Sequence, residues 1–141
     1  MALEHMFGIA GSALNAQTAR MNVSASNLSN AGTVAGTDKD AFRAKRTDFK
    51  AILAQHAGAV SSGLAGGVQV SRITDDPKPI ARMSDPGNPA ADKDGYVYLS
   101  NVNEMTEMVE MMAASRSYQN NVEVINIARQ LMARTLDIIK S

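Results

Sequence analysis

Residues 103–140 read NEMTEMVEMMAASRSYQNNVEVINIARQLMARTLDIIK, a run that contains neither Gly nor Pro. Its first turns carry Glu104, Glu107 and Glu110, and its last turn carries Lys140. A helix dipole favours negative charge near the N-terminal end and positive charge near the C-terminal end. The run therefore predicts one long helix, from about Asn103 to Lys140.

Apolar residues in this helix fall on two opposed faces. A seam with alternating spacings of three and four residues, typical of coiled coils, consists of Met108, Met111, Ser115, Tyr118, Val122, Ile125, Arg129, Met132, Leu136 and Ile139. At about 100° per residue, the opposite side carries Val124, Ile127, Leu131 and Ile138. A narrow polar wedge lies between the two faces. A helix of this kind must be covered from two directions.

Residues 1–31 predict a second helix, in which Phe7, Leu14, Met21 and Leu28 recur at a spacing of seven. Between Glu4 and Asp38 the only charged residue is Arg20, whereas an ordinary protein carries about a quarter charged residues. The polar positions hold Ser, Asn, Gln and Thr, which can be buried where a neighbouring backbone satisfies their hydrogen bonds. We therefore expect partners on several sides of this helix.

The middle segment, residues 32–100, holds all four prolines and most of the glycines. Strand-like patterns occur at residues 42–49, 68–73 and 96–99, the last directly after the turn-forming pair Asp94-Gly95. Prolines between Pro77 and Pro89 predict a loop there. The segment predicts a small, irregular, β-rich module.

The predicted fold is mainly α, with a coiled-coil-like pair of terminal helices. Its parts are an N-terminal axial helix (1–31), the β/loop module (32–100) and a C-terminal axial helix (101–141). At 1.5 Å per residue the helices would be about 44 and 57 Å long, whereas a compact body of 70 residues is roughly 25–30 Å across. The module would leave apolar helical surface uncovered. We therefore expect other subunits to cover it.

Composition excludes several functional classes. Fourteen Lys and Arg balance fourteen Asp and Glu, so no net charge attracts nucleic acid, and there is no cysteine for a disulfide, a thiolate metal site or a nucleophile. His5 and His56 match no ligand spacing and have no acid–nucleophile constellation nearby. No apolar run reaches the roughly 18–20 residues of a membrane span. We expect no catalytic site, metal, cofactor, small-molecule substrate, nucleic acid or membrane span.

Two local patterns admit a chemical interpretation and a structural one. Asp92-Lys93-Asp94-Gly95 begins like a calcium loop, but Asn103 stands where the closing Glu is needed, so a turn is expected. The methionines near the start of the C-terminal helix lack the His or Cys partners of a metal or haem site. They predict an adaptable packing surface.

Two stretches resemble the terminal signatures of bacterial flagellar rod and hook proteins. Residues 24–31, SASNLSNA, contain the pattern Asn-Leu-x-Asn-Ala, and residues 101–122, NVNEMTEMVEMMAASRSYQNNV, are similar to the C-terminal signature. Residues 42–45 (FRAK), 85–89 (DPGNP) and 95–97 (GYV) bring the resemblance closest to the proximal-rod members of the flagellar basal-body rod family.

This resemblance implies a structural, non-enzymatic part of the basal-body rod in the periplasm. Such a protein is exported unfolded by the flagellar type III apparatus. It polymerises through its terminal helices, with itself and with other rod proteins, into the drive shaft that transmits torque. Packing between subunits is expected at Phe7, Leu14, Met21, Leu28, Met108, Met111, Tyr118, Val122, Ile125, Met132, Leu136, Ile139, Val124, Ile127, Leu131 and Ile138. Hydrogen bonds that fix register are expected at Asn27, Asn30, Gln119, Asn120 and Asn121.

Two other functional classes remain open at this point. A soluble adaptor or export chaperone could hold a client in a groove between its helices, and it would be a stable folded monomer or dimer alone. A wall-degrading hydrolase would need convergent carboxylates in a cleft. The acidic residues here are scattered or lie at a helix start, which argues against the hydrolase.

Overall fold

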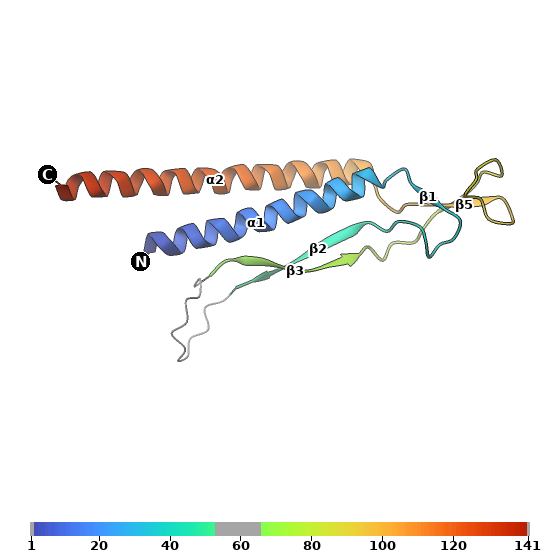
Figure 1. Ribbon diagram of the computed structural model, residues 1–141, viewed down its shortest axis with the longest axis horizontal. Helices are drawn as coiled ribbons and strands as arrows, with labels where there is room; N and C mark the ends of the chain where they lie inside the picture. Colours follow the sequence, from blue (N-terminus) through green and yellow to red (C-terminus); the bar gives the residue numbers. More distant parts are fainter. Residues whose placement is uncertain (1, 53–65, 141) are drawn as a thin grey trace, which may run out of the picture.

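The computed structural model describes residues 2–52 and 66–140; the side chains of 2–4, 139 and 140 lie outside the description, as does His56. The elements in chain order are α1 (Ala2–Ser29), β1 (Val34–Ala35), β2 (Lys45–Ala51), β3 (Val68–Asp75), β4 (Arg82–Ser84), β5 (Tyr96–Leu99) and α2 (Glu104–Lys140). The mainly α prediction is confirmed. Figure 1 shows α1 and α2 side by side and antiparallel, with both termini at one end of the molecule.

The β2–β3 hairpin lies along α1 on the side away from α2, so α1 is the middle layer of three (Figure 1). The strands pair antiparallel from Lys45 opposite Asp75 to Ala51 opposite Val68, with a bulge after Asp48. The Val68 N–H donates to Ser12 Oγ of α1 at 3.1 Å.

The expectation that the middle segment leaves both helices half covered is therefore wrong for much of α1. Extended strands rise about 3.3 Å per residue, so a seven-residue strand follows the helix for over 20 Å. The sequence analysis treated the middle segment as a compact body and did not allow for strands that extend along the helix. Strands β2 and β3 thus supply a second covering layer of α1 from within the chain.

A second, three-stranded sheet with the order β1-β5-β4 lies at the end of the molecule away from the termini (Figure 1). Its central strand β5 carries the fully buried Val97. The predicted turn before β5 is present: Asp92 Oδ1 accepts from the N–H groups of Asp94 and Tyr96, and Gly95 has φ of 77°. The loop predicted between Pro77 and Pro89 is wrong at β4. Three residues are too few to show a strand period, and β4 forms because the edge of β5 is free to pair.

The inner seam of α2 is the row of buried and half-buried residues that recurs at alternating spacings of four and three. It consists of Glu107, Met111, Ala114, Tyr118, Asn121, Ile125, Ala128 and Met132. Since α1 is the element packed along α2, this seam faces α1.

Half of the seam predicted from the sequence is therefore shifted by one residue. Met111, Tyr118, Ile125 and Met132 belong to the inner seam, but Met108 is 50% exposed and Leu136 57% exposed, and Arg129 is also exposed. Ala114 and Ala128, at 0% and 1% exposed, replace the expected larger residues because a small side chain lets two helices approach closely. Val122 is half-buried beside the seam.

Replacement of Ala114 by Leu should lower the free energy of unfolding by about 1–3 kcal/mol, because added methylenes overpack a closed contact. The adjacent Ala113 is exposed, so Ala113→Leu is a matched control that should change stability little. Urea unfolding followed by circular dichroism measures both. Equal stability of the two variants would contradict the assignment of Ala114 to the helix contact.

Candidate assembly interface

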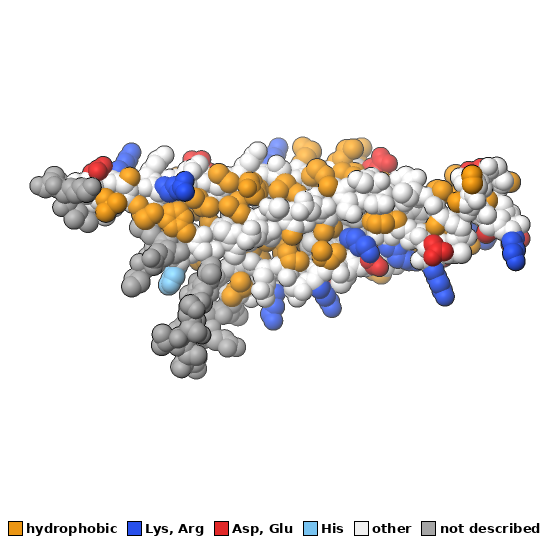
Figure 2. All heavy atoms as spheres, viewed as in Figure 1, with side chains coloured by type: hydrophobic (Ala, Val, Ile, Leu, Met, Phe, Trp, Pro, Cys, Tyr) orange, Lys and Arg blue, Asp and Glu red, His pale blue; other side chains and the backbone are white. Residues whose placement is uncertain are grey.

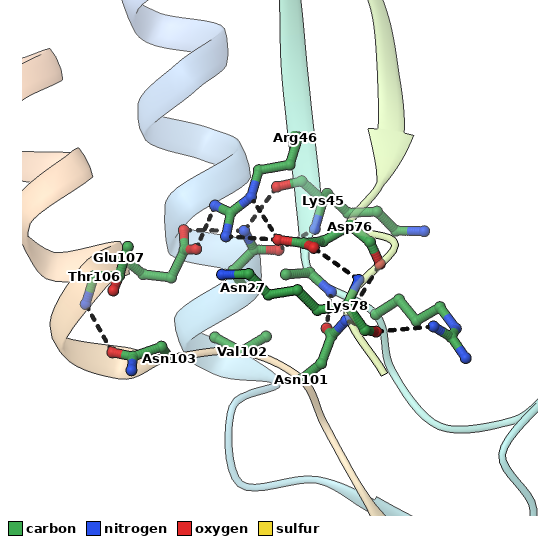
Figure 3. Close-up of polar contacts among 12 residues, drawn as sticks. Asn27, Lys45, Arg46, Asp76, Lys78, Asn101, Val102, Asn103, Thr106 and Glu107 are labelled. Atoms are coloured by element: carbon green, nitrogen blue, oxygen red, sulfur yellow. Dashed lines mark hydrogen bonds and ion pairs between the residues drawn. The ribbon is translucent and has the colours of Figure 1, made fainter. Parts of the chain in front are cut away.

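A cluster of polar side chains joins the end of α1, the start of α2 and the hairpin (Figure 3). Its centre is Asn27, which is 0% exposed. Asn27 Nδ2 donates to the Lys45 carbonyl at 2.9 Å, and the Lys45 N–H donates to Asn27 Oδ1 at 2.8 Å. The amide thus pairs with the first residue of β2 as a neighbouring strand would. This pair of bonds fixes where the hairpin starts along α1.

Glu107 connects this contact to α2. Its carboxylate accepts from Asn27 Nδ2 at 3.0 Å through Oε2 and from Arg46 Nη1 at 2.6 Å through Oε1. Glu107 is fully buried in the chain. A buried carboxylate requires a charged partner and further hydrogen bonds, and Arg46 and Asn27 supply them.

Arg46 also reaches the end of the hairpin. Its Nε donates to Asp76 Oδ2 at 3.2 Å, and the Lys78 N–H donates to Asp76 Oδ1 at 3.0 Å. The Lys78 hydrogen bond, reinforced by Arg46, lowers the pKa of Asp76 despite its burial. Burial lowers the pKa of Arg46, but the bonds to Glu107 and Asp76 outweigh this effect and raise it. Arg46 and Asp76 are therefore both charged at neutral pH.

Two further asparagines position the segment before α2. Asn101 Oδ1 accepts from the Ala44 N–H at 2.7 Å, and its Nδ2 donates to the carbonyls of Asp76 and Lys78. Asn103 is the N-cap, since its Oδ1 accepts from the Thr106 N–H at 3.0 Å. Together with Glu107 they fix the direction in which α2 leaves the cluster.

The outer face of α2 is exposed and carries two apolar patches. The methionine patch consists of Met105, Met108, Val109 and Met112, which are 73%, 50%, 59% and 60% exposed. The aliphatic patch consists of Val124, Ile127, Leu131 and Ile138, which are 43%, 49%, 51% and 76% exposed. Figure 2 shows hydrophobic side chains gathered on the free edge of α2 near the end where the helix begins. Contiguous apolar surface of this kind marks an interaction site.

The structure divides the residues predicted for subunit packing into two groups. Those at least partly covered by the chain itself are Phe7, Leu14, Met21, Leu28, Met111, Tyr118, Val122, Ile125 and Met132. Those on open surface are Met108, Leu136, Val124, Ile127, Leu131 and Ile138. The side chain of Ile139 lies outside the described residues. Only the second group is available to a neighbour without rearrangement.

The residues predicted to fix register are likewise divided. Asn27 bonds within its own chain, and Asn30 Nδ2 donates to the Ser26 carbonyl at 2.8 Å near the end of α1. Gln119 and Asn120 are exposed on α2, and Asn121 lies in the inner seam. Of this set, Gln119 and Asn120 are the ones exposed on the outer face.

The sequence analysis missed the roles of Glu107, Arg46 and Asp76. Glu107 was used only as one of the acidic residues that suit the helix dipole, and its full burial was not predicted. The available signal was Asn27, a polar residue in a helix with almost no charge. Such a residue requires a partner, but its position does not reveal which one.

Comparison with known proteins matches both ends of the chain. Residues 7–35 match the family model of the flagella basal body rod protein, and residues 93–138 match that of the flagellar basal body rod FlgEFG protein C-terminal. Flagellar basal-body rod protein FlgC of Yersinia enterocolitica is 49% identical over 138 residues, 98% of each chain. The proteins of the same name from Escherichia coli O6:H1 and Salmonella typhimurium are 46% and 45% identical over the same share.

The chain belongs to the FlgC family of flagellar basal-body rod proteins. It is therefore a structural rod protein of the flagellar basal body, and the soluble adaptor left open by the sequence is not supported. Neither helix, over the residues described, combines the length and apolarity of a membrane span. Within the same residues, no three acidic or histidine side chains converge on a metal position.

Family membership gives the polar cluster a wider meaning. Asn27 opens the Asn-Leu-x-Asn-Ala signature, and Glu107 lies in the C-terminal signature. The two signatures, 80 residues apart, meet in the buried bond between these side chains. In this chain, these two signature residues join the end of α1 to the start of α2.

Removal of the buried carboxylate tests the cluster. Glu107→Ala should lower the free energy of unfolding by about 2–4 kcal/mol, because Arg46 and Asn27 lose their shared partner. The matched control is Glu104→Ala, one turn earlier and exposed, which should cost below about 1 kcal/mol. Chemical denaturation measures both, and comparable losses would refute the central position of Glu107.

Proposed function

We propose that this chain polymerises through its terminal helices into the proximal part of the rod, the shaft that crosses the periplasm and transmits torque. In this proposal α1 and α2 form a coiled-coil-like pair, and helices of neighbouring subunits cover the outer face of α2. The partners are other copies of the chain and other rod proteins. The protein has no enzymatic role, no cofactor, no small-molecule substrate and no nucleic-acid partner.

The observation that carries the proposal is the exposure of the methionine and aliphatic patches. Full burial of a Leu, Ile or Met side chain contributes roughly 1.5–3 kcal/mol, and these residues already have about half of that surface covered. Covering both patches would thus stabilise a neighbour contact by several kcal/mol. Unbranched methionine side chains also adapt to neighbours of different shape, as contacts with several kinds of rod protein require.

The inner side of the helix pair supports a role in transmitting force. Glu107 and Asn27 are fully buried and bonded to each other, and Arg46 extends the contact to the hairpin. Close-packed and fully hydrogen-bonded groups deform little. The subunit would therefore pass a load from one neighbour to the next with its own helices held in register.

Passage through the flagellar type III export apparatus is the remaining part of the proposal. Zero cysteines means that no disulfide has to form or open on the way. The helices and hairpin meet only through residues distant in sequence, such as Asn27 and Glu107. An unfolded chain therefore forms these contacts only after it has left the channel, and docking on the growing rod then adds burial from neighbours.

A charge in either patch should stop incorporation. Met108→Asp or Leu131→Asp would place an unpaired carboxylate in the neighbour contact, which costs several kcal/mol. The matched control is Thr106→Asp, an exposed position in the first turn of α2, where the helix dipole favours the charge. Swimming and the amount of protein in purified basal bodies measure the effect. Normal assembly of both patch variants would overturn the proposal.

The unassembled chain should exchange its amide hydrogens unevenly. Residues 133–138 of α2 are all exposed, and Figure 1 shows that this end extends past the start of α1. Amides there should exchange fastest in α2, whereas those around Glu107 and Ala114 should be the most protected. Hydrogen-exchange mass spectrometry on the purified chain measures the gradient. Uniform protection along α2 would show that its free end needs no neighbour.

A further inference from the structure

The hairpin and α2 lie against the same half of α1. Asn27 shows this directly, because it bonds both to Lys45 at the start of β2 and to Glu107 near the start of α2. Arg20, about 20° away from Asn27 around the helix, pairs with Glu110 of α2. Among the described elements, only α2, β2 and β3 pack along α1. The other half of α1 is therefore open.

This open half is an uncharged strip, the α1 flank. It consists of Gly11, Asn15, Thr18, Asn22, Ala25 and Ser29, at alternating spacings of four and three. All except Gly11 are exposed. At about 100° per residue, Thr18 lies about 160° around the helix from Arg20, which pairs with α2, and about 120° from Ser12, which bonds to the hairpin. An exposed strip of this length ordinarily includes charged residues, so its composition suits a surface that a partner covers.

A recess lies between the hairpin and α2, on the side of the molecule away from the α1 flank. It begins as a groove of about 340 Å³, whose lining includes Phe49 of β2, Val23 of α1 and Glu110 of α2. From Glu110, residues at a spacing of seven continue along the same side of α2, turning by only about 20° per step. They are Ser117, Val124, Leu131 and Ile138. The last three belong to the aliphatic patch, so this patch extends the recess toward the end of α2.

We propose that, in the assembled rod, the α1 flank of one copy of this protein lies in the recess of the next copy. Copies in a shaft point the same way, and α1 and α2 of one chain are antiparallel (Figure 1). The neighbouring α1 therefore packs antiparallel along α2, beside the hairpin edge that carries Phe49. This contact rests on the proposed function and names the two surfaces that neighbouring copies share.

The two surfaces match in size and in charge. Val124, Ile127 and Leu131 are 43%, 49% and 51% exposed, so large side chains project from the recess. The α1 flank offers small residues, and facing large residues with small ones lets two helices interdigitate closely. Neither surface brings a charge that would have to be buried without a partner. Burial of the aliphatic patch therefore meets no opposing desolvation of charge.

The polar groups of the two surfaces also suit each other. Asn15 and Asn22 of the α1 flank are exposed, as is Asn120 on the side of α2 that forms the recess. Within the residues that the structure describes, none of these three amides bonds to another part of the chain. A side-chain amide both donates and accepts, so amides from the two copies can pair when water leaves the contact.

The positions of the two surfaces favour a second copy as the occupant. The α1 flank and the recess lie on opposite sides of one molecule, so each copy can bind the next while its own free surface receives another. Such a head-to-tail contact continues into a helical assembly. Contact between two aliphatic patches would instead use the same surface on both copies and end at a dimer.

Disulfide cross-linking in purified basal bodies tests this contact, because the chain has no cysteine of its own. One cysteine replaces Val124, and a second is placed at one position at a time along residues 7–29 of the same chain. Oxidation should give about fivefold more product at α1-flank positions than at Ala16 and Ala19, which border the hairpin. Since every copy has one flank and one recess, the product should be a ladder of dimers, trimers and larger multiples of the chain.

A second cysteine position in the recess tests the direction of the helices. Ala113 is exposed and lies on the same side of α2 as Val124, eleven residues nearer the start of the helix. With Ala113→Cys in place of Val124→Cys, the strongest cross-link should move about eleven residues toward the end of α1, because the two helices are antiparallel. A shift toward the start of α1 would contradict the proposed packing.

Three further results would overturn the proposal: products that stop at dimers, products that join the chain only to a different rod protein, and equal cross-linking at Ala16 and Thr18. Basal bodies that contain the cysteine chains but give no product at any position would also remove the contact, and they would leave the proposed function standing. The proposed function fails separately if the unmodified chain is absent from purified basal bodies.

Discussion

A single buried carboxylate determines how the pieces of this protein fit together. Glu107 has no access to solvent, so its carboxylate has to be satisfied within the chain: Arg46 on the hairpin supplies the opposite charge, and Asn27 on α1 supplies a hydrogen bond. No two of the three layers can slide past each other without breaking one of these bonds. The start of the hairpin along α1 and the alignment of α2 with α1 follow from this fixed point.

The two faces of α2 serve opposite requirements. The inner face carries Ala114 and Ala128, whose small side chains let α1 approach closely. Both are already buried within the chain, so a neighbour could bury no more of their surface. The outer face carries large, flexible or branched side chains that remain about half exposed. The subunit is therefore closely packed along the inner side of α2 and leaves apolar side chains exposed along the outer side. In the proposed rod contact, a neighbouring subunit covers the exposed side.

Local patterns in the sequence predicted the elements, but not how they come together. Both helices follow from long stretches without proline and from apolar spacing, and β5 follows from the turn at Asp94-Gly95. The placement of the hairpin along α1 depends on the amide of Asn27 meeting the backbone of Lys45, a contact between distant residues that has no periodicity. Half of the inner seam was predicted one residue too late, because counting apolar residues favoured Met108 over Glu107. Only the paired helices show that a charged residue with its own partners can occupy the buried position.

Both termini lie at one end of the molecule, and the β1-β5-β4 sheet lies at the other (Figure 1). That sheet touches the rest of the chain through short linkers, and its Asp85–Pro89 turn exposes Pro86 and Gly87. An added Cβ at Gly87 would come no nearer than 4.0 Å to another side chain. This turn is consequently the natural location for a fluorescent tag or an affinity epitope. A fusion at either end of the polypeptide would instead sit beside the helical surfaces proposed to contact neighbours.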